Sequence, residues 1–424
     1  MFQFLQKYKS RLYPLYAVTD QALQSLVNLL SNVVILRFAS KSDYGIYGVG
    51  FASVMLLMGL THALIGLQMT VIAPDKPEQD RKAYFASMFV AQVALMAAVL
   101  TVTLIAMMLG RQWISPDYQT LITVVAFAAP GVLVMQFMRQ IHYFFNLAGR
   151  VLTFDLIFFI LYFGGLSLIV YLKLDNIHLW ALLLNGLIAL VIGLLAILYS
   201  TRLKILESIS RAKASLIEAW QSGSWAVLGS FMSVVQAQGY VYLLAALVGT
   251  TAVAEMNAAR LFISPLLVMS NGFSRVMIPK MALLKSEGKI DRAVGLAFKV
   301  WLVLVVMLVV YLGFVALGWG WINDFMAQKG YHNLWLLVGL WGVYFAANAS
   351  VNTPAELLQI FRQFRLLTLT GIISSVLVFL GSIPAIALYG IIGAIGVLIL
   401  GELGLATLLW TRFQRVRAAA GSEA

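Results

Sequence analysis

Long apolar stretches follow one another along almost the whole chain of 424 residues. Each has about 20 residues or more, the length that an α-helix needs to cross a hydrocarbon core of about 30 Å. Backbone N–H and C=O groups in lipid must find partners within the protein, so these stretches form helices. The sequence therefore predicts an all-α polytopic membrane protein with twelve transmembrane helices, at residues 13–38, 44–73, 83–109, 118–138, 151–172, 177–199, 222–247, 253–273, 293–317, 334–357, 366–388 and 391–409.

The basic residues are concentrated in every second gap between these stretches. Twenty-two of the 29 Lys and Arg lie at the two termini and in the even-numbered gaps, whereas four lie in the odd-numbered gaps. Short loops rich in Lys and Arg stay in the cytoplasm, so we expect both termini there. The net charge of +12 is thus a topology signal. Nucleic acid is not an expected partner, because no basic cluster lies in a soluble domain.

A long connection lies at the middle of the chain. Residues 201–221 alternate Leu and Ile with basic side chains at roughly helical spacing, which indicates an amphipathic linker, either a helix on the inner leaflet or a solvated segment. Weak internal similarity recurs at an offset of about half the chain, since residues 39–51 match 248–260 and residues 150–154 match 365–369. We therefore predict an N-terminal six-helix lobe (1–200) and a C-terminal lobe with a short basic tail (222–424), related by a parallel pseudo-twofold repeat around a central cavity.

The first span carries a polar stripe. Asp20, Gln24, Asn28 and Asn32 recur every four residues, and steps of four keep them on one slowly winding face of a helix. Asn and Gln also serve as hydrogen-bonding contacts between packed helices. A carboxylate and three carboxamides in one row favour a hydrophilic cavity. We expect the spans at 13–38, 222–247 and 253–273 to wall it, with help from His62 and Gln68 of the span at 44–73.

Other polar side chains within the spans extend this set. The predicted cavity residues are Arg260, Arg37, Gln236, Asn348 and Asn352, and the ion-coupling candidates beside Asp20 are Glu255, Glu356 and Glu402. Glu255 and Arg260 are five residues apart, about 140° around a helix, and are poorly placed to pair with each other. The alternative for Arg260 and Arg37 is that their long side chains reach the outer interface.

Three further features exclude other chemistry. The chain has no cysteine, and its four histidines, including His332, lack the spacing of metal ligands, so neither a metal nor another cofactor is expected. No phosphate-binding glycine loop occurs. Asp155, near the start of the span at 151–172, has the position of a carboxylate that stabilises a helix N-terminus, so we interpret it as structural.

The connection between the first two spans carries a family motif. Residues 36–48, LRFASKSDYGIYG, resemble the ARxLxxxxYGxYxxA hallmark of polysaccharide flippases and exporters, with Leu36 where that family has Ala. Residues 258–262, 278–280 and 388–395 are similar to that family too. These Wzx-like proteins of O-antigen and teichoic acid export belong to the multidrug/oligosaccharidyl-lipid/polysaccharide exporter superfamily, which also contains multidrug exporters and the lipid II flippase.

The resemblance implies a flippase that works by alternating access. It would move an undecaprenyl-diphosphate-linked oligosaccharide from the inner to the outer leaflet of the bacterial cytoplasmic (inner) membrane, for O-antigen or exopolysaccharide synthesis. Its partners would be that lipid-linked oligosaccharide, membrane lipids, and a polysaccharide polymerase with its chain-length regulator. Arg260 matches the family's cavity arginine and is the first candidate for phosphate contact, with Arg37 second. Lipid II is disfavoured, because its flippase has two additional helices.

Two alternatives remain. A multidrug antiporter of the same fold would use Asp20 with H+ or Na+ as the coupling ion. A membrane glycosyltransferase or polymerase would need acids, bases or cations that converge in an extracytoplasmic loop or pocket. The outer loops here are short and poor in His, Asp and Glu, so we do not expect an enzyme.

Overall fold

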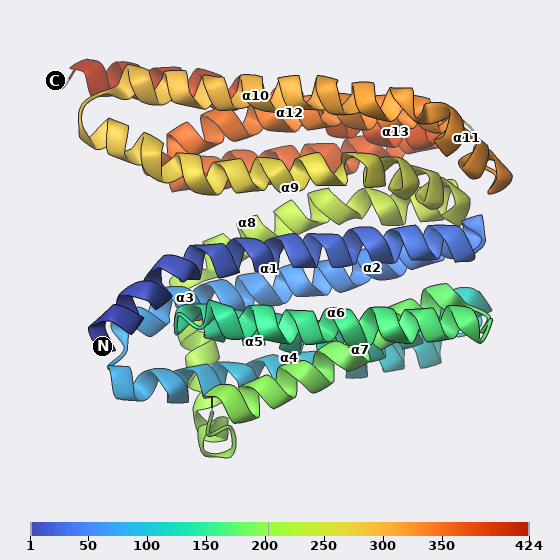
Figure 1. Cartoon of the computed structure of the whole chain (residues 1–424), viewed down its shortest axis with the longest axis horizontal. Helices are drawn as coiled ribbons and strands as arrows, with labels where there is room; N and C mark the ends of the chain where they lie inside the picture. The colour runs from blue at the N-terminus through green and yellow to red at the C-terminus, as the bar shows by residue number, and fades with distance from the viewer. Residues whose placement is uncertain (1, 202, 332, 423–424) are drawn as a thin grey trace. The chain divides into compact units, whose positions relative to one another are not determined.

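The chain is helical over most of its length, and its described residues contain no strand (Figure 1). The structure is a computed structural model that describes residues 2–201, 203–331 and 333–422. His332 and the outermost ends of the two predicted lobes, at residues 1 and 424, lie outside these ranges.

The helices form two compact units. The first unit contains Met1–Ala39 and Ile46–Val234, and the second contains Ser40–Gly45 and Val235–Ala424. The division between them therefore falls within a helix, α8, further along the chain than the connection at 201–221. A short segment near the N-terminus, residues 40–45, makes its contacts with the second unit.

The first unit is built from α1 to α7 and most of α8. Its main helices are α1 (Phe2–Phe38), α2 (Lys41–Thr61), α3 (Leu67–Ile72), α4 (Glu78–Gly110), α5 (Pro116–Phe144), α6 (Ala148–Tyr171), α7 (Ile177–Leu195) and α8 (Ala212–Leu247). Short π-helical turns lie at η1 (His62–Gly66) and η3 (Ala196–Thr201), and short 3-10 turns lie at η2 (Ala73–Asp75) and η4 (Leu206–Arg211).

The second unit contains the end of α8 and all later helices. These are α9 (Thr250–Ser286), α10 (Ile290–Leu317), α11 (Trp319–Gln328), α12 (Leu334–Ile360) and α13 (Phe364–Ser422). The short helix α11 lies in a gap where the sequence pattern predicts no helix. Within α13, Gly390 has φ +56° and ψ −131°, so the chain bends there and α13 consists of two arms. Gly390 is the residue type that adopts this conformation without steric cost.

The predicted spans are confirmed. Ten helices of the described chain are long and apolar enough to cross a membrane, with α13 counted once and α2 to η2 counted as one. The second arm of α13 adds another. The remaining predicted span lies in α1. The polar stripe lowers the mean hydropathy of this helix, so it is not among the ten helices counted above. The molecule therefore has the predicted all-α, polytopic architecture.

Residues 203–221 of the predicted connection contain no separate α-helix. Its first part contains the 3-10 turn η4, and from Ala212 onward it is already the start of α8. Leu206 and Ile209 are exposed on this turn. An ion pair joins the start of α8 to the turn that precedes α4. It forms between Lys76 of that turn and Glu218 of α8, whose Nζ and Oε1 atoms are 2.6 Å apart.

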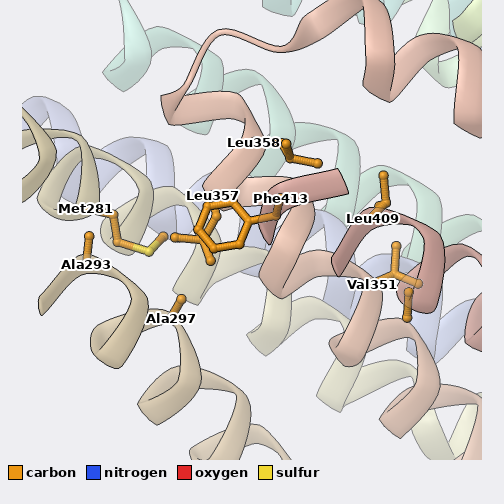
Figure 2. Packing of buried hydrophobic residues seen from close by; sticks show 9 residues of the cluster. Met281, Ala293, Ala297, Val351, Leu357, Leu358, Leu409 and Phe413 are labelled. Carbon is orange, nitrogen blue, oxygen red and sulfur yellow. The ribbon is translucent and has the colours of Figure 1, made fainter. Parts of the chain in front are cut away.

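The core of the second unit brings four helices together. Buried apolar side chains of α9, α10, α12 and α13 pack against one another in a single cluster (Figure 2). Met281 of α9 and Leu357 of α12 lie in it fully buried, and the last arm of α13 contributes Leu409 and Phe413. One face of that arm is thereby fixed against the unit.

The first unit depends on a close approach of α5 and α7. Both helices place glycines at the contact, and a Cβ atom added to Gly131 would lie 1.8 Å from the carbonyl oxygen of Gly186. Small residues of this kind let membrane helices approach at backbone distance, where packing is the main source of association.

We predict that Gly131→Ala destabilises the protein, although Ala is the better helix former. The added methyl group would overlap with the backbone of α7, and overpacking of this kind costs about 1–3 kcal/mol. The matched control is Gly164→Ala in α6, where an added Cβ meets nothing within 4 Å. Thermal unfolding in detergent should show a lower melting temperature for Gly131→Ala only. Equal melting temperatures for both variants would contradict the close contact.

Candidate functional site

The carboxylate of Asp20 on α1 is the centre of a buried polar cluster. Its side chain is 1% exposed. Atom Oδ2 accepts hydrogen bonds from the hydroxyl of Tyr143 on α5 at 2.5 Å and from Nε2 of Gln24 at 2.8 Å. Atom Oδ1 has no hydrogen-bond partner among the described residues. Asp20 therefore has one oxygen held by two hydrogen bonds and one buried oxygen without a partner among the described residues.

A second carboxylate lies beside the first. Gln24 Nε2 also donates to Oδ2 of Asp155 on α6 at 3.4 Å, so one carboxamide connects the two acidic groups. The guanidinium of Arg139 on α5 binds both carboxylate oxygens of Asp155. Its Nη2 donates to Oδ1 at 2.8 Å and its Nε donates to Oδ2 at 3.0 Å. Two-point contacts of this kind are among the stronger charged hydrogen bonds.

This geometry corrects the interpretation of Asp155. The first turn of α6 contains no acidic residue, because the helix begins at Ala148 and Asp155 lies in its third turn. Asp155 is 2% exposed and forms an ion pair with Arg139, so it does not stabilise the helix N-terminus. Arg139 in turn lies within α5, although the charge pattern assigns it to a cytoplasmic gap.

The polar stripe of α1 borders a cavity of about 370 Å³ within the first unit. Gln24, Asn28, Arg139 and Asp155 line it together with apolar side chains such as Phe51. Its lining residues come from α1, α2, α5, α6 and α7. Of the four residues of the stripe, Gln24 and Asn28 line this cavity, whereas Asp20 and Asn32 do not, and the spans predicted at 222–247 and 253–273 contribute no lining residue.

The members of the stripe differ in their surroundings. Asn28 is exposed, and its backbone carbonyl accepts a hydrogen bond from Nδ2 of Asn32 at 2.8 Å. Asn32 is partly buried and does not line the cavity. Arg37, at the last turn of α1, is exposed, and its guanidinium lies 5.7 Å from the ring of Phe38. Arg37 thus has the surroundings of an interfacial side chain.

In the second unit, Arg260 of α9 lies among aromatic side chains. Its guanidinium carbon is 5.5 Å from the ring centroid of Trp341 on α12, and its Nη1 donates to the hydroxyl of Tyr240 on α8 at 3.1 Å. Among the described residues, no carboxylate lies within ion-pairing distance of Arg260. A cation over an aromatic face keeps its remaining N–H donors for another acceptor.

A carboxylate and two carboxamides lie on the neighbouring helices. Oε1 of Glu402 on α13 accepts from the Tyr344 hydroxyl at 3.3 Å, and Asn348 also hydrogen-bonds Glu402. Asn352 Nδ2 donates to Oδ1 of Asn348 at 3.3 Å. The predicted residues Asn348, Asn352 and Glu402 therefore form one network.

Two other predicted residues lie outside this network. Glu356, further along α12, hydrogen-bonds Ser274 of α9. Gln236 of α8 accepts a hydrogen bond at Oε1 from Ser375 of α13 at 2.7 Å. Both side chains make contacts between helices, which is the packing role that polar residues commonly have in membranes.

Glu255 on α9 pairs with Lys41 of the segment at 40–45. It forms an ion pair with Lys41, whose Nζ also donates to the carbonyl of Gly330 at 2.6 Å and lies 5.1 Å from the ring of Tyr331. Burial, and the nearby Glu255 carboxylate, raise the pKa of the Tyr331 phenol, so it stays neutral beside Lys41. The expectation that Glu255 and Arg260 do not pair is confirmed, and Lys41 is the partner of Glu255.

A close backbone contact fixes the same segment. A Cβ atom added to Gly45 would lie 1.8 Å from the carbonyl oxygen of Thr250 at the start of α9, and Ser42 hydrogen-bonds Thr250 through their hydroxyls at 3.0 Å. This contact explains the Tyr-Gly pair of the hallmark in physical terms. Tyr44 is buried, and the glycine beside it permits the approach.

Sequence reasoning missed Tyr143 and the functional pairing of Arg139 with Asp155. The signal for Asp155 was present, since it lies within the predicted span 151–172, where an unpaired charge would be costly, whereas the predicted span 118–138 ends before Arg139. Tyr143 gave no such signal, because tyrosines near span ends are common anchors at the membrane surface.

Comparison with known proteins shows the fold. No family model matches the chain, and no curated protein matches it by sequence. A solved multidrug resistance MATE family transporter of the MOP superfamily, in its inward-facing conformation, matches with a TM-score of 0.70 over 97% of this chain and 99% of that chain, at 14% identity. The chain has the fold of this superfamily.

Other solved structures give the same result. The lipid II flippase MurJ, in its inward closed conformation, matches with a TM-score of 0.70 at 11% identity, over 95% of this chain and 87% of that chain. A MOP superfamily transporter from Pyrococcus furiosus, described as having a binding pocket of reverse polarity, matches with a TM-score of 0.58 at 15% identity, over 97% of this chain and 95% of that chain. The fold is therefore common to drug transporters and a lipid flippase.

We predict that Arg139→Gln destabilises the first unit by about 3 kcal/mol, because removal of one partner leaves a buried charge unpaired. The double variant Arg139→Gln/Asp155→Asn should recover part of this loss, because it contains no unpaired charge. The measurement is the free energy of unfolding in mixed detergent micelles containing sodium dodecyl sulfate. Additive losses in the double variant would show that the pair does not couple.

Proposed function

We propose that this protein is a flippase for an undecaprenyl-diphosphate-linked oligosaccharide, moving it from the inner to the outer leaflet of the bacterial cytoplasmic membrane by alternating access. The observation that carries the proposal is Arg260, a cation held over Trp341 without a described carboxylate partner. A diphosphate is the anion that such a guanidinium binds well, because its N–H donors match phosphate oxygens.

The network beside Arg260 supports a sugar-containing substrate. Asn348, Asn352 and the Tyr344 hydroxyl offer donors and acceptors of the kind that bind sugar hydroxyls. These groups lie on α12, while Arg260 lies on α9, and both helices pack in the second unit. The diphosphate and the first sugars would therefore meet adjacent helices.

Coupling to H+ or Na+ is proposed at Asp20. Its Oδ1 atom has no partner among the described residues, and Gln24 connects Asp20 to Asp155, which lines the cavity of the first unit. A proton or Na+ bound at Asp20 would change its bonds to Tyr143 and Gln24, and so link occupancy to the contact of α1 with α5. Glu255 is a weaker candidate because Lys41 neutralises it.

A cation-coupled multidrug antiporter is the second candidate. It is favoured by the likeness to MATE family transporters and by the Asp20 carboxylate close to the cavity of the first unit. The two candidates differ in the charge of the substrate. Arg260 favours an anionic lipid, whereas Asp20, whose Oδ1 has no described partner, favours a cation.

The proposed setting follows from the charge pattern. We place both termini in the cytoplasm and the protein in the inner membrane, with a polysaccharide polymerase and a chain-length regulator acting on the product. In this orientation the start and the end of α13 lie on the cytoplasmic side.

We predict that Arg260→Ala reduces translocation of a fluorescent lipid-linked oligosaccharide in proteoliposomes by about tenfold or more, because a charged hydrogen bond to phosphate is lost. Arg260→Lys should retain part of the activity through its charge. Arg37→Ala is the comparison and should have a small effect, since Arg37 has interfacial surroundings. Similar, mild losses for Arg260→Ala and Arg37→Ala would refute the proposed phosphate contact.

We predict that Asp20→Asn abolishes transport while the protein stays folded, because the variant keeps the shape of the side chain and loses its charge. Asp117→Asn, which changes an exposed carboxylate at the start of α5, is the matched control. Both variants should be assayed for lipid-linked oligosaccharide translocation and for efflux of a cationic dye. Dye efflux by the wild-type protein without oligosaccharide translocation would support the antiporter instead, and full activity of Asp20→Asn would remove Asp20 from the mechanism.

A further inference from the structure

The two arms of α13 enclose an apolar groove of about 380 Å³ on the second unit. Ile373, Leu377 and Leu400 form its exposed rims, and Ser374 and Val378 are buried at its floor. The hydroxyl of Thr370, which also lines the groove, donates back to the carbonyls of Leu366 and Leu367. The groove therefore presents hydrocarbon along almost its whole length.

The groove exists because the arms are close at one end and separate at the other. A Cβ atom added to Gly393 would lie 1.9 Å from the carbonyl oxygen of Ala385, and one added to Gly401 would lie 2.2 Å from Val378. One turn further, an added Cβ at Gly404 meets nothing within 4 Å. Gly404 is thus an open position that faces the groove.

The length of the groove matches one leaflet. Its lining on the second arm runs from Val397 to Leu408, about 16 Å at 1.5 Å per helical residue. Half of a hydrocarbon core of about 30 Å is about 15 Å. The arms approach each other at Val378 and Gly401, so the groove narrows toward the bend, and its length along the second arm corresponds to about half of the hydrocarbon core.

A cation lies at the open end. Arg412 is exposed and follows Leu408 by four residues, so it continues the face of the helix that lines the groove. Leu409 and Phe413, on a neighbouring face, are buried in the core of the unit (Figure 2). The arm is therefore anchored on one side, while its other side presents an apolar groove that leads to a positive charge.

We propose that this groove is a binding site for an anionic phospholipid of the inner leaflet, with one acyl chain in the groove and the phosphate at Arg412. The assignment to the inner leaflet rests on the orientation proposed above. An acyl chain spans one leaflet, as the groove does, whereas a polyprenyl tail is much longer than the groove. Lys and Arg side chains at this level of a membrane attract anionic headgroups.

The test is native mass spectrometry of the purified full-length protein, titrated with phosphatidylglycerol or phosphatidylcholine. Wild-type protein should retain one phosphatidylglycerol molecule in preference to phosphatidylcholine. Gly404→Leu fills the groove and should weaken retention about tenfold. Gly371→Leu is the matched control, since Gly371 lies on the first arm with open space around it and does not line the groove.

The charge is tested separately. Arg412→Gln should remove most of the preference for phosphatidylglycerol, whereas Arg365→Gln, which changes an exposed arginine in the first turn of α13, should keep it. If Gly404→Leu fails to fold, a photoreactive residue at Leu400 should crosslink phosphatidylglycerol, and one at exposed Leu388, near the bend, should not.

Three results would overturn the site. These are equal retention by Gly404→Leu and Gly371→Leu, equal retention of the two phospholipids by the wild-type protein, and displacement of phosphatidylglycerol by an equimolar amount of undecaprenyl phosphate. The last result would assign the groove to a polyprenyl tail. The measurement requires no transport, so a failure of the proposed flippase activity would not affect it.

Discussion

A charged side chain inside a hydrocarbon core needs a partner, and the polar interior of this protein follows from that constraint. Asp155 is held by Arg139, and Glu255 is held by Lys41. Arg260 instead lies on Trp341 with a phenol as its hydrogen-bond partner. The two paired carboxylates connect helices, whereas Arg260 has no carboxylate partner among the described residues and is the residue that we propose for phosphate contact.

The helices could be predicted from sequence because the bilayer imposes their length and forces their backbones to pair internally. The bend at Gly390 was also predictable, since the apolar run of 366–409 is far too long for one span. The start of α8 could not be predicted, because residues 212–221 are polar enough to indicate a loop. In the structure these residues are helical, and Glu218 among them forms an ion pair with Lys76. The short helix α11 likewise lies in a gap without an apolar run.

The candidate site was predictable only in part. The four-residue spacing of Asp20, Gln24 and Asn28 identifies a polar face, but it does not identify what that face meets. Tyr143 is separated from Asp20 by 123 residues, and Asp155 from Gln24 by 131. Such pairings depend on how α1, α5 and α6 pack, which periodicity does not contain. Among solved proteins the same fold occurs in drug transporters and in a lipid flippase, so the substrate must be inferred from individual side chains.

The pairing of Lys41 with Glu255 has a consequence for biosynthesis. The two residues are 214 positions apart in the chain. At a synthesis rate of about 5–20 residues per second, Lys41 leaves the ribosome roughly 10–40 seconds before its partner does. During that interval the turn after α1 lacks the contacts that α9 and the Gly330 carbonyl later provide. The first helices must therefore enter the membrane with this turn unfinished, and its final shape is one of the later events in the assembly of the protein.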